Sequence, residues 1–321
     1  MKVVTNAGAP LPSPARVAPR ARAPWRVGLV QERWHPDPDE HRAAIAEGVR
    51  VAAAEGAQLV CLMELTLSPY FAVDPAGPGA TVLGVRVEPE ALPGGPTHEL
   101  ATSLAREHSV AVHASLYEAA PDAGAGDPRG YNTAICVAPS GALLARTRKL
   151  HLPVTAGYFE DRWFRPAPVD DGASPFPVVD LGAVQLGFPT CWDQWFPELA
   201  RAYSLGGAEV LVFPTAIGSE PDHPGFDTEP LWERVITANG ITNGTHMVVV
   251  NRIGVEGPLT FYGSSFVSDP YGRVLVQAPR DEPAVLVAEL DLDARRDWLA
   301  LFPLLATRRP DAYGRLTERG R

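Results

Sequence analysis

The chain contains little cysteine, little basic charge and no long apolar run. Its 321 residues include three cysteines, an odd number without paired spacing. That excludes a disulfide framework and favours a reducing, cytoplasmic compartment. No apolar stretch approaches the ~20 residues that a membrane-spanning helix requires, so no membrane association is expected. Lysine and arginine number 28 against 38 acidic residues, a formal net charge of −10, which gives a nucleic-acid partner no electrostatic footprint.

What the chain does contain is enough apolar material for a sizeable core. Hydrophobic residues make up 45% and charged residues 21%, a balance typical of globular proteins. Residues 1–24 stand apart, being rich in proline, alanine and arginine, with no acidic residue before Glu32. Their five prolines disfavour the amphipathic helix of a transit peptide. We expect a flexible extension, because this composition has too little apolar surface to offset its ordering entropy.

From residue 25 onward, apolar strands alternate with helices. The run "AQLVCLME" (57–64) is almost continuously apolar, as expected of a strand covered on both faces. Further strands are predicted at 25–31, 109–117, 132–139, 142–150, 181–190, 208–213, 245–251 and 283–292, with a hairpin at 264–278 and helices at 39–56, 97–108, 196–206 and 229–243. No linker is long enough to divide residues 25–300, so a single α/β domain is predicted.

Three strand ends carry an unexpected polar group, and in α/β folds such ends are where ligand and catalytic groups gather. Glu64 closes the apolar run 57–64, Lys149 closes "GALLARTRK" near the end of the strand predicted at 142–150, and Cys191 directly follows "VQLGFPT". Singly, each has an ordinary explanation: a solvated carboxylate, a surface lysine and a small buried hydrophobe. Alternation places Lys149 on the face opposite Arg146 and Arg148.

Together the three residues make a workable catalytic set. A cysteine nucleophile needs a base for its proton and a positive group for the developing oxyanion. Glu64 can be that base, and the Lys149 ammonium can face the oxyanion. A cysteine–histidine pair is the competing arrangement. His151 lies two residues past Lys149 and could line the same pocket, although a packed histidine is the simpler interpretation. No two cysteines or histidines have the spacing of zinc ligands, so no metal site is predicted.

The chain resembles the nitrilase-like carbon–nitrogen hydrolases from about residue 25 to about residue 314. The resemblance rests on "CLMELTLSPYF" around Glu64, "RKLHLP" around Lys149 and "CWDQWFPELAR" around Cys191. It extends through "PTAIGSEP" (214–221), "NRIG" (251–254), "TFYGSSF" (260–266) and "RRPDAY" (308–313). Several motifs in the same order are far more specific than any single signature. The set is most similar to the branch that contains N-carbamoylputrescine amidases.

This resemblance implies a four-layer α–β–β–α sandwich with pseudo-twofold related halves, in one domain over residues 25–314 with a short tail at 315–321. It implies a catalytic triad of Glu64, Lys149 and Cys191, with Glu160 orienting the lysine and helping to move protons. The residues that it places against the substrate are Tyr70, Trp192, Trp195, Ala216 and Glu220. The implied chemistry needs no metal and no organic cofactor.

The resemblance leaves three functions open. The leading hypothesis is a thiol amidohydrolase, which passes its acyl-enzyme to water. An acyltransferase would pass the same intermediate to an amine. A catalytically retired scaffold is disfavoured, because a retired site usually loses a member of its catalytic set.

Two departures from the family pattern bear on the substrate. Pro189 and Thr190 stand where an aliphatic residue usually precedes the cysteine, and "WLALFPLLATRRPDAY" lacks the tryptophan–glycine segment of carbamoylputrescine enzymes. Beyond the cysteine, Gln194 and Trp195 replace the arginines that hold a substrate carboxylate in relatives acting on carbamoyl amino acids. We therefore expect an uncharged or cationic amide in place of a carbamoyl amino acid.

The loop "GSEPDHPGFDTEP" (218–230) adds acidic residues near the expected pocket mouth, namely Glu220, Asp222, Asp227 and Glu229. Although an ordinary solvated loop would look the same, an acidic rim favours a substrate with an ammonium tail. N-carbamoylputrescine or a related cationic amide is the predicted substrate. The departures at 189–190 and near the C-terminus leave a larger, specialised amide as the alternative. The resemblance also implies at least a homodimer, packed through the helix at 196–206.

Overall fold

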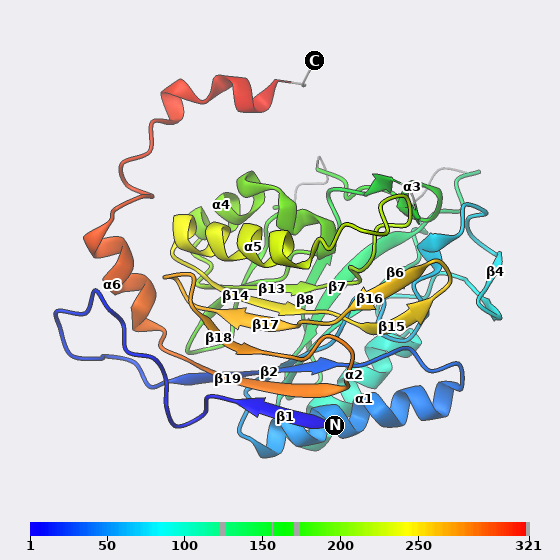
Figure 1. Cartoon of the computed structure of the whole chain (residues 1–321), viewed down its shortest axis with the longest axis horizontal. Coiled ribbons are helices and arrows are strands. Elements are labelled where there is room, and N and C mark those ends of the chain that lie inside the picture. The colour runs from blue at the N-terminus through cyan, green and yellow to red at the C-terminus, as the bar shows by residue number, and fades with distance from the viewer. Residues whose placement is uncertain (122–125, 156, 170–173, 319–321) are drawn as a thin grey trace.

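The structure is a computed structural model of the chain, and it describes all residues except 122–125, 156, 170–173 and 319–321. Two large sheets form its centre (Figure 1). The first has the strand order β1 (Lys2–Thr5), β19 (Ala284–Leu290), β2 (Trp25–Gln31), β3 (Leu59–Cys61), β6 (Ala111–Glu118), β7 (Tyr131–Val137) and β8 (Leu143–Arg148). The second has the order β11 (Val178–Asp180), β12 (Gln185–Gly187), β13 (Val210–Pro214), β14 (His246–Val250), β17 (Phe266–Ser268) and β18 (Val274–Gln277).

The two sheets repeat one pattern of strand directions. In the first sheet β2, β3 and β6 run parallel, and β7 and β8 then continue antiparallel. In the second sheet β12, β13 and β14 run parallel, and β17 and β18 then continue antiparallel. The carboxyl ends of β3 and β12 lead to Glu64 and Cys191, and β8 leads to Lys149.

Helices cover the outer face of each sheet (Figure 1). The helices α1 (Pro38–Ala54) and α2 (Pro96–His108) pack on the first sheet, and α4 (Pro197–Leu205) and α5 (Glu229–Asn243) pack on the second. Between the sheets lies an apolar core with side chains from both, such as Leu29 and Val212. The predicted four-layer α–β–β–α sandwich is confirmed.

The remaining elements are short. Two-stranded ribbons join β4 (Thr81–Val82) to β5 (Val85–Arg86), β9 (Val154–Thr155) to β10 (Tyr158–Phe159), and β15 (Ile253–Glu256) to β16 (Leu259–Tyr262). The short helices are α3 (Glu160–Trp163), α6 (Asp293–Leu301) and the 3₁₀ segments η1 (Phe71–Val73), η2 (Cys191–Trp195), η3 (Pro310–Ala312) and η4 (Gly314–Thr317). No helix in the described part of the chain is long and apolar enough to cross a membrane.

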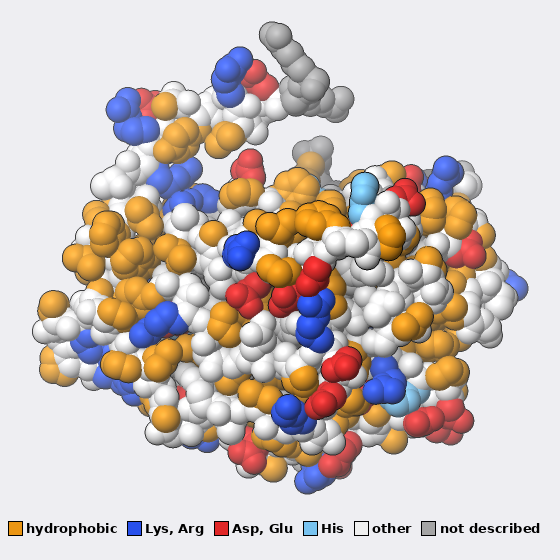
Figure 2. All heavy atoms as spheres, in the orientation of Figure 1, with side chains coloured by type: hydrophobic (Ala, Val, Ile, Leu, Met, Phe, Trp, Pro, Cys, Tyr) orange, Lys and Arg blue, Asp and Glu red, His pale blue; other side chains and the backbone are white. Residues whose placement is uncertain are grey.

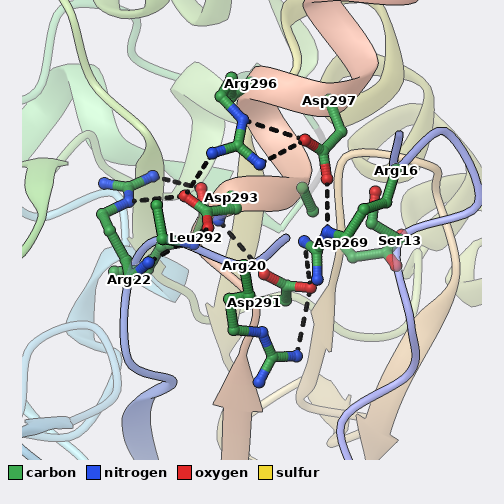
Figure 3. A network of polar contacts seen from close by, with 12 residues as sticks. Ser13, Arg16, Arg20, Arg22, Asp269, Asp291, Leu292, Asp293, Arg296 and Asp297 are labelled. Carbon is green, nitrogen blue, oxygen red and sulfur yellow. Dashed lines mark hydrogen bonds and ion pairs between the residues drawn. The ribbon is translucent and has the colours of Figure 1, made fainter. Parts of the chain in front are cut away.

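The N-terminal segment differs from the flexible extension expected from its composition. Its strand β1 pairs in parallel with β19 and forms the edge of the first sheet. Its arginines pair with carboxylates of the domain, most of which are buried (Figure 3). The contacts join Arg16 to Asp291 (2.6 Å) and Asp297 (2.9 Å), Arg20 to Asp291 (3.3 Å), and Arg22 to Asp293 (3.2 Å) and Glu209 (2.8 Å). Ion pairs and the pairing of β1 with β19 thus hold the segment on the domain. Amino-acid composition alone predicts neither interaction.

The C-terminal segment from residue 302 extends away from the layers as an arm (Figures 1 and 2). Apolar side chains on it are exposed, including Phe302 (49%) and Leu316 (63%). Between the arm and α4 lies an open groove lined by Arg201 and Leu205 of α4 and by Tyr313 and Leu316 of the arm.

Candidate active site

Glu64 lies in a buried loop directly beyond β3. The next residue, Leu65, has a φ of 49°, a left-handed conformation that a non-glycine residue adopts only where its surroundings enforce it. Buried Arg252 supplies that enforcement by donating to the carbonyl oxygens of Glu64 (2.7 Å) and Leu65 (3.2 Å). Arg252 is itself paired with Glu256 at 2.6 Å. The loop that presents the glutamate is therefore fixed through its main chain.

Lys149 lies at the centre of the site, and none of its surface is exposed. Its Nζ donates to Oε1 of Glu64 at 2.9 Å and to Oε1 of Glu160 at 2.8 Å. Burial alone would lower the pKa of Lys149, but the carboxylates of Glu160 and Glu64 raise it above its usual value. The lysine is thus a permanent cation between two buried carboxylates.

Glu160 begins α3, and its carboxylate is buried beside the lysine. The hydroxyl of Tyr70 donates to the same Oε1 atom at 2.8 Å. Burial raises the pKa of Glu160 to about 7, and the nearby charge of Glu64 raises it as well, against the opposing effect of Lys149. The group can therefore exchange a proton near neutral pH.

Cys191 opens the 3₁₀ segment η2 and faces the cavity. Burial raises the pKa of its thiol well above the usual value, and the charge of Glu64 adds to this, although Lys149 and a hydrogen bond from the Ala216 backbone oppose it. The thiol is therefore protonated at neutral pH, and a base must remove its proton during attack. The charges that act on it come from Glu64, Lys149 and Glu160, so the structure brings all four predicted catalytic residues together.

One buried carboxylate joins the cysteine turn to the segment after the lysine. Oδ2 of Asp193 accepts from the hydroxyl (2.8 Å) and backbone N–H (3.3 Å) of Thr190, directly before Cys191. Its Oδ1 accepts from the backbone N–H of His151 at 3.1 Å and contacts the Nδ1 of that ring at 2.7 Å. His151 also stacks on Phe196. The histidine is thus engaged by Asp193, and Thr190, a departure from the family pattern, caps the turn.

A cavity of about 250 Å³ lies in front of Cys191. Its lining includes the five residues predicted to contact substrate, Tyr70, Trp192, Trp195, Ala216 and Glu220. It also includes residues that the sequence did not single out, Pro153, Thr155, Tyr158, Ile217, Phe226, Thr228 and Leu231. Glu160 lines it, whereas Glu64 and Lys149 are fully buried and are not among its lining residues. The surface is mostly apolar, and no lysine or arginine is among the described residues that line it.

The acidic loop contributes less charge to the cavity than its sequence suggests. Asp227 forms a two-pronged ion pair with Arg280 (2.8 and 2.9 Å) and does not line the cavity. Asp222 is exposed on the outside of the loop. Glu220 is the member that reaches the cavity, and burial raises its pKa, an effect that His223 opposes.

Two buried residues that the sequence analysis missed support Glu64. Asn132 donates to its side chain, and Arg252 donates to its main chain. The available signal was a polar residue inside a buried strand, such as Asn132 in "YNTAICV". Among the residues that the structure describes, no three His, Cys, Asp or Glu side chains are grouped to hold a metal ion.

The family model described as carbon-nitrogen hydrolase matches residues 26–300. The chain belongs to the carbon–nitrogen hydrolase family, and it is a hydrolase acting on carbon–nitrogen bonds other than peptide bonds. It is 37% identical over 273 residues to an N-carbamoylputrescine amidase of Solanum lycopersicum, covering 83% of this chain and 85% of that protein. A citrullinase of Francisella tularensis is 30% identical over 298 residues, covering 92% and 98%. The predicted resemblance is confirmed.

Solved structures agree with the fold. A carbon-nitrogen hydrolase from Helicobacter pylori G27 superposes with a TM-score of 0.77 at 27% identity, covering 92% of this chain and 99% of that one. A variant of the amidase from Nesterenkonia sp. AN1 has a TM-score of 0.66 at 25% identity, covering 92% and 97%. That structure carries the acetamide moiety of fluoroacetamide added covalently at its active-site cysteine.

Proposed function

We propose that the chain is a thiol amidohydrolase that cleaves N-carbamoyl amines with a cationic tail, with N-carbamoylputrescine as the model substrate. The proposal rests chiefly on the cavity in front of Cys191, which is mostly apolar, is lined by Glu220, and has no lysine or arginine among the described residues that line it. The names of the relatives support it, since N-carbamoylputrescine and citrulline both carry a carbamoyl group on an amine nitrogen.

In the proposed mechanism Glu64 accepts the thiol proton as the sulfur of Cys191 attacks the carbamoyl carbon. The Lys149 ammonium and the backbone N–H of Trp192 hold the tetrahedral oxyanion. The carbon–nitrogen bond then breaks, and the proton held by Glu64 goes to the departing ammonia or amine. Water, deprotonated by Glu64, attacks the thioester-type intermediate, the carbon–sulfur bond breaks, and the thiol recovers its proton.

Glu160 is proposed to orient Lys149 and to buffer protons. Its carboxylate shares the ammonium with Glu64 at nearly equal distances of 2.8 and 2.9 Å. Because its pKa is about 7, Glu160 can accept or release a proton beside Lys149 during the reaction. Transfer of the acyl group to an amine instead of water remains the second candidate function, favoured by the apolar cavity walls, which would limit water. Product analysis with added amines distinguishes the two.

The substrate prediction is tested with three carbamoyl compounds of similar length. N-carbamoylputrescine carries an ammonium, n-butylurea lacks it, and citrulline adds a carboxylate. We expect kcat/KM for N-carbamoylputrescine to exceed that for n-butylurea by at least about tenfold, because a half-buried carboxylate such as Glu220 gains a partner. Citrulline is expected to be the poorest, since its carboxylate would face Glu220 with no basic side chain in the described lining.

The variant Glu220→Gln should close the gap between N-carbamoylputrescine and n-butylurea by raising KM for the cation alone. Ammonia release measured over a concentration series gives both constants. If n-butylurea or citrulline matched N-carbamoylputrescine on the wild-type enzyme, the charge argument would be wrong.

We also propose a homodimer in which α4 packs against its twofold mate. Leu205 (48%) and Leu316 (63%) are exposed in the groove between α4 and the C-terminal arm. Exposed apolar surface of this kind is typical of a protein–protein interface. Light scattering at micromolar concentration should give twice the chain mass or more, and Leu205→Glu should lower it. Leu144→Glu, at an exposed leucine of β8 (36%), is the matched control. A monomeric wild-type chain would refute the assembly.

A further inference from the structure

Asn132 is a buried amide in the row of β7 side chains that faces the core between the sheets. It is fully buried, and Ala134 and Cys136, two and four residues further along the strand, belong to that apolar core. Alternation puts all three side chains on one face. The backbone N–H of Lys149 donates to the Asn132 carbonyl at 2.8 Å. Asn132 and Lys149 are therefore neighbours on adjoining strands, and both reach the same carboxylate.

The donors around Glu64 are distributed unequally between its two oxygens. Oε1 accepts from Nδ2 of Asn132 at 2.7 Å and from Nζ of Lys149 at 2.9 Å. Oε2 is buried and has no hydrogen-bond partner among the described residues. A buried carboxylate oxygen without a donor is costly in a resting fold. In a general base, the same oxygen is free to accept a proton.

We propose that Asn132 is a positioning residue that determines which oxygen of Glu64 takes the thiol proton. Its amide holds Oε1, which leaves Oε2, the oxygen without a donor, as the basic atom that takes the thiol proton. This inference rests on the proposed function, in which Glu64 is the base. The orientation of the amide follows from its partner, since rotating it would bring its own oxygen against the carboxylate.

Lys149 cannot do this work alone. It donates to Glu160 as well as to Glu64, and in the proposed mechanism it also stabilises the oxyanion. As the lysine strengthens its contact with the oxyanion, its contact with Glu64 weakens at the moment when the carboxyl group carries the proton. Asn132 is neutral and contacts no other carboxylate in the described structure, so it keeps Glu64 in place throughout.

The test compares Asn132→Ala and Asn132→Asp with the wild-type enzyme on N-carbamoylputrescine. We expect Asn132→Ala to lower kcat by about 10- to 100-fold with KM within about twofold, since only the placement of the base changes. Asn132→Asp keeps the size of the side chain but replaces its amide with a carboxyl group beside Glu64, and it should lower kcat further. The rate at which iodoacetamide alkylates Cys191 should fall in parallel, because that reaction also needs the thiol proton removed.

Thr133→Ala is the matched control. Thr133 is the next residue of β7, is equally buried, and donates to a different buried carboxylate, Glu118, at 2.6 Å. It should retain wild-type kcat and alkylation rate even if it lowers the melting temperature. An Asn132→Ala enzyme with kcat within twofold of wild type, or an equal loss in Thr133→Ala, would overturn the inference.

The outcome separates this inference from the proposed function. The variant Glu64→Gln is measured in parallel with the same substrate. If Glu64→Gln remained active, the proposed base itself would be wrong. If Glu64→Gln were inactive while Asn132→Ala kept normal kcat and alkylation, only the role of Asn132 would be lost.

Discussion

Cys191→Ala is expected to lower kcat/KM for N-carbamoylputrescine by at least about 10⁴-fold, because the variant has no atom that can form the covalent intermediate. The fold should be unaffected, since the side chain lies at a cavity wall and only its sulfur is removed. The loss in kcat/KM is measured as ammonia release over a concentration series of the substrate. Residual activity above a tenth of wild type would exclude Cys191 as the nucleophile.

The other two cysteines provide matched controls. Cys61 and Cys136 are fully buried in the core between the sheets. Burial raises the pKa of both thiols, that of Cys136 to about 12, so neither should react. Cys136→Ala should keep normal turnover at some cost in stability. Mass spectrometry after fluoroacetamide treatment should find one adduct, on Cys191, in the wild-type protein and none in Cys191→Ala.

Lys149→Met should produce the second largest loss, at least about 10³-fold in kcat/KM, because it removes an oxyanion donor and leaves two carboxylates facing each other. Breaking such a buried arrangement typically costs about 3–5 kcal/mol of unfolding free energy. Urea unfolding and ammonia release give the two quantities on one sample. Activity within tenfold of wild type would contradict the role given to this lysine.

A second substitution separates the two effects of losing Lys149. The double variant Lys149→Met/Glu160→Gln removes one of the two facing charges, so part of the lost stability should return. Activity should not return, because the oxyanion donor is still missing. The single variant Glu160→Gln keeps the pair between Lys149 and Glu64, and it should fold normally with strongly reduced turnover. If the double variant recovered activity as well, the lysine would act only in stability.

The layers of the fold were predictable because they follow from local patterns. The helix predicted at 39–56 is α1 (Pro38–Ala54), whose N-terminus is capped by Asp37. The strand predicted at 57–64 is shorter, β3 (Leu59–Cys61), because the chain leaves the sheet before Glu64. The helix α6 was missed, because its sequence "DARRDWLAL" is only nine residues long and four of them are charged.

The candidate site was predictable where its residues end strands. Alternation correctly separated Lys149, which faces Glu64 and Glu160, from Arg146 and Arg148, which pair with Glu118 on the other face. Glu160 looked like part of a solvated loop, and only the family resemblance marked it. The supporting contacts of Asn132 and Arg252 with Glu64 span 68 and 188 residues. A local pattern marks Asn132 as a polar residue inside a buried strand, but it cannot assign a partner over such a separation.

Because the N-terminal segment adds a strand and ion pairs to the domain, it is part of the folded unit. With β1 in place, the edge of the first sheet is a strand of four residues instead of the seven-residue, buried β19, and short edge strands resist pairing with other chains. The same segment supplies counter-ions to Asp291 and Asp293, whose side chains are only 5% and 3% exposed. A chain trimmed to Trp25 would expose β19 as the edge strand and leave Asp291 without its arginine partners, whereas Asp293 would keep Arg296 at 3.5 Å. We therefore expect a chain that begins at Trp25 to aggregate more readily than the full chain.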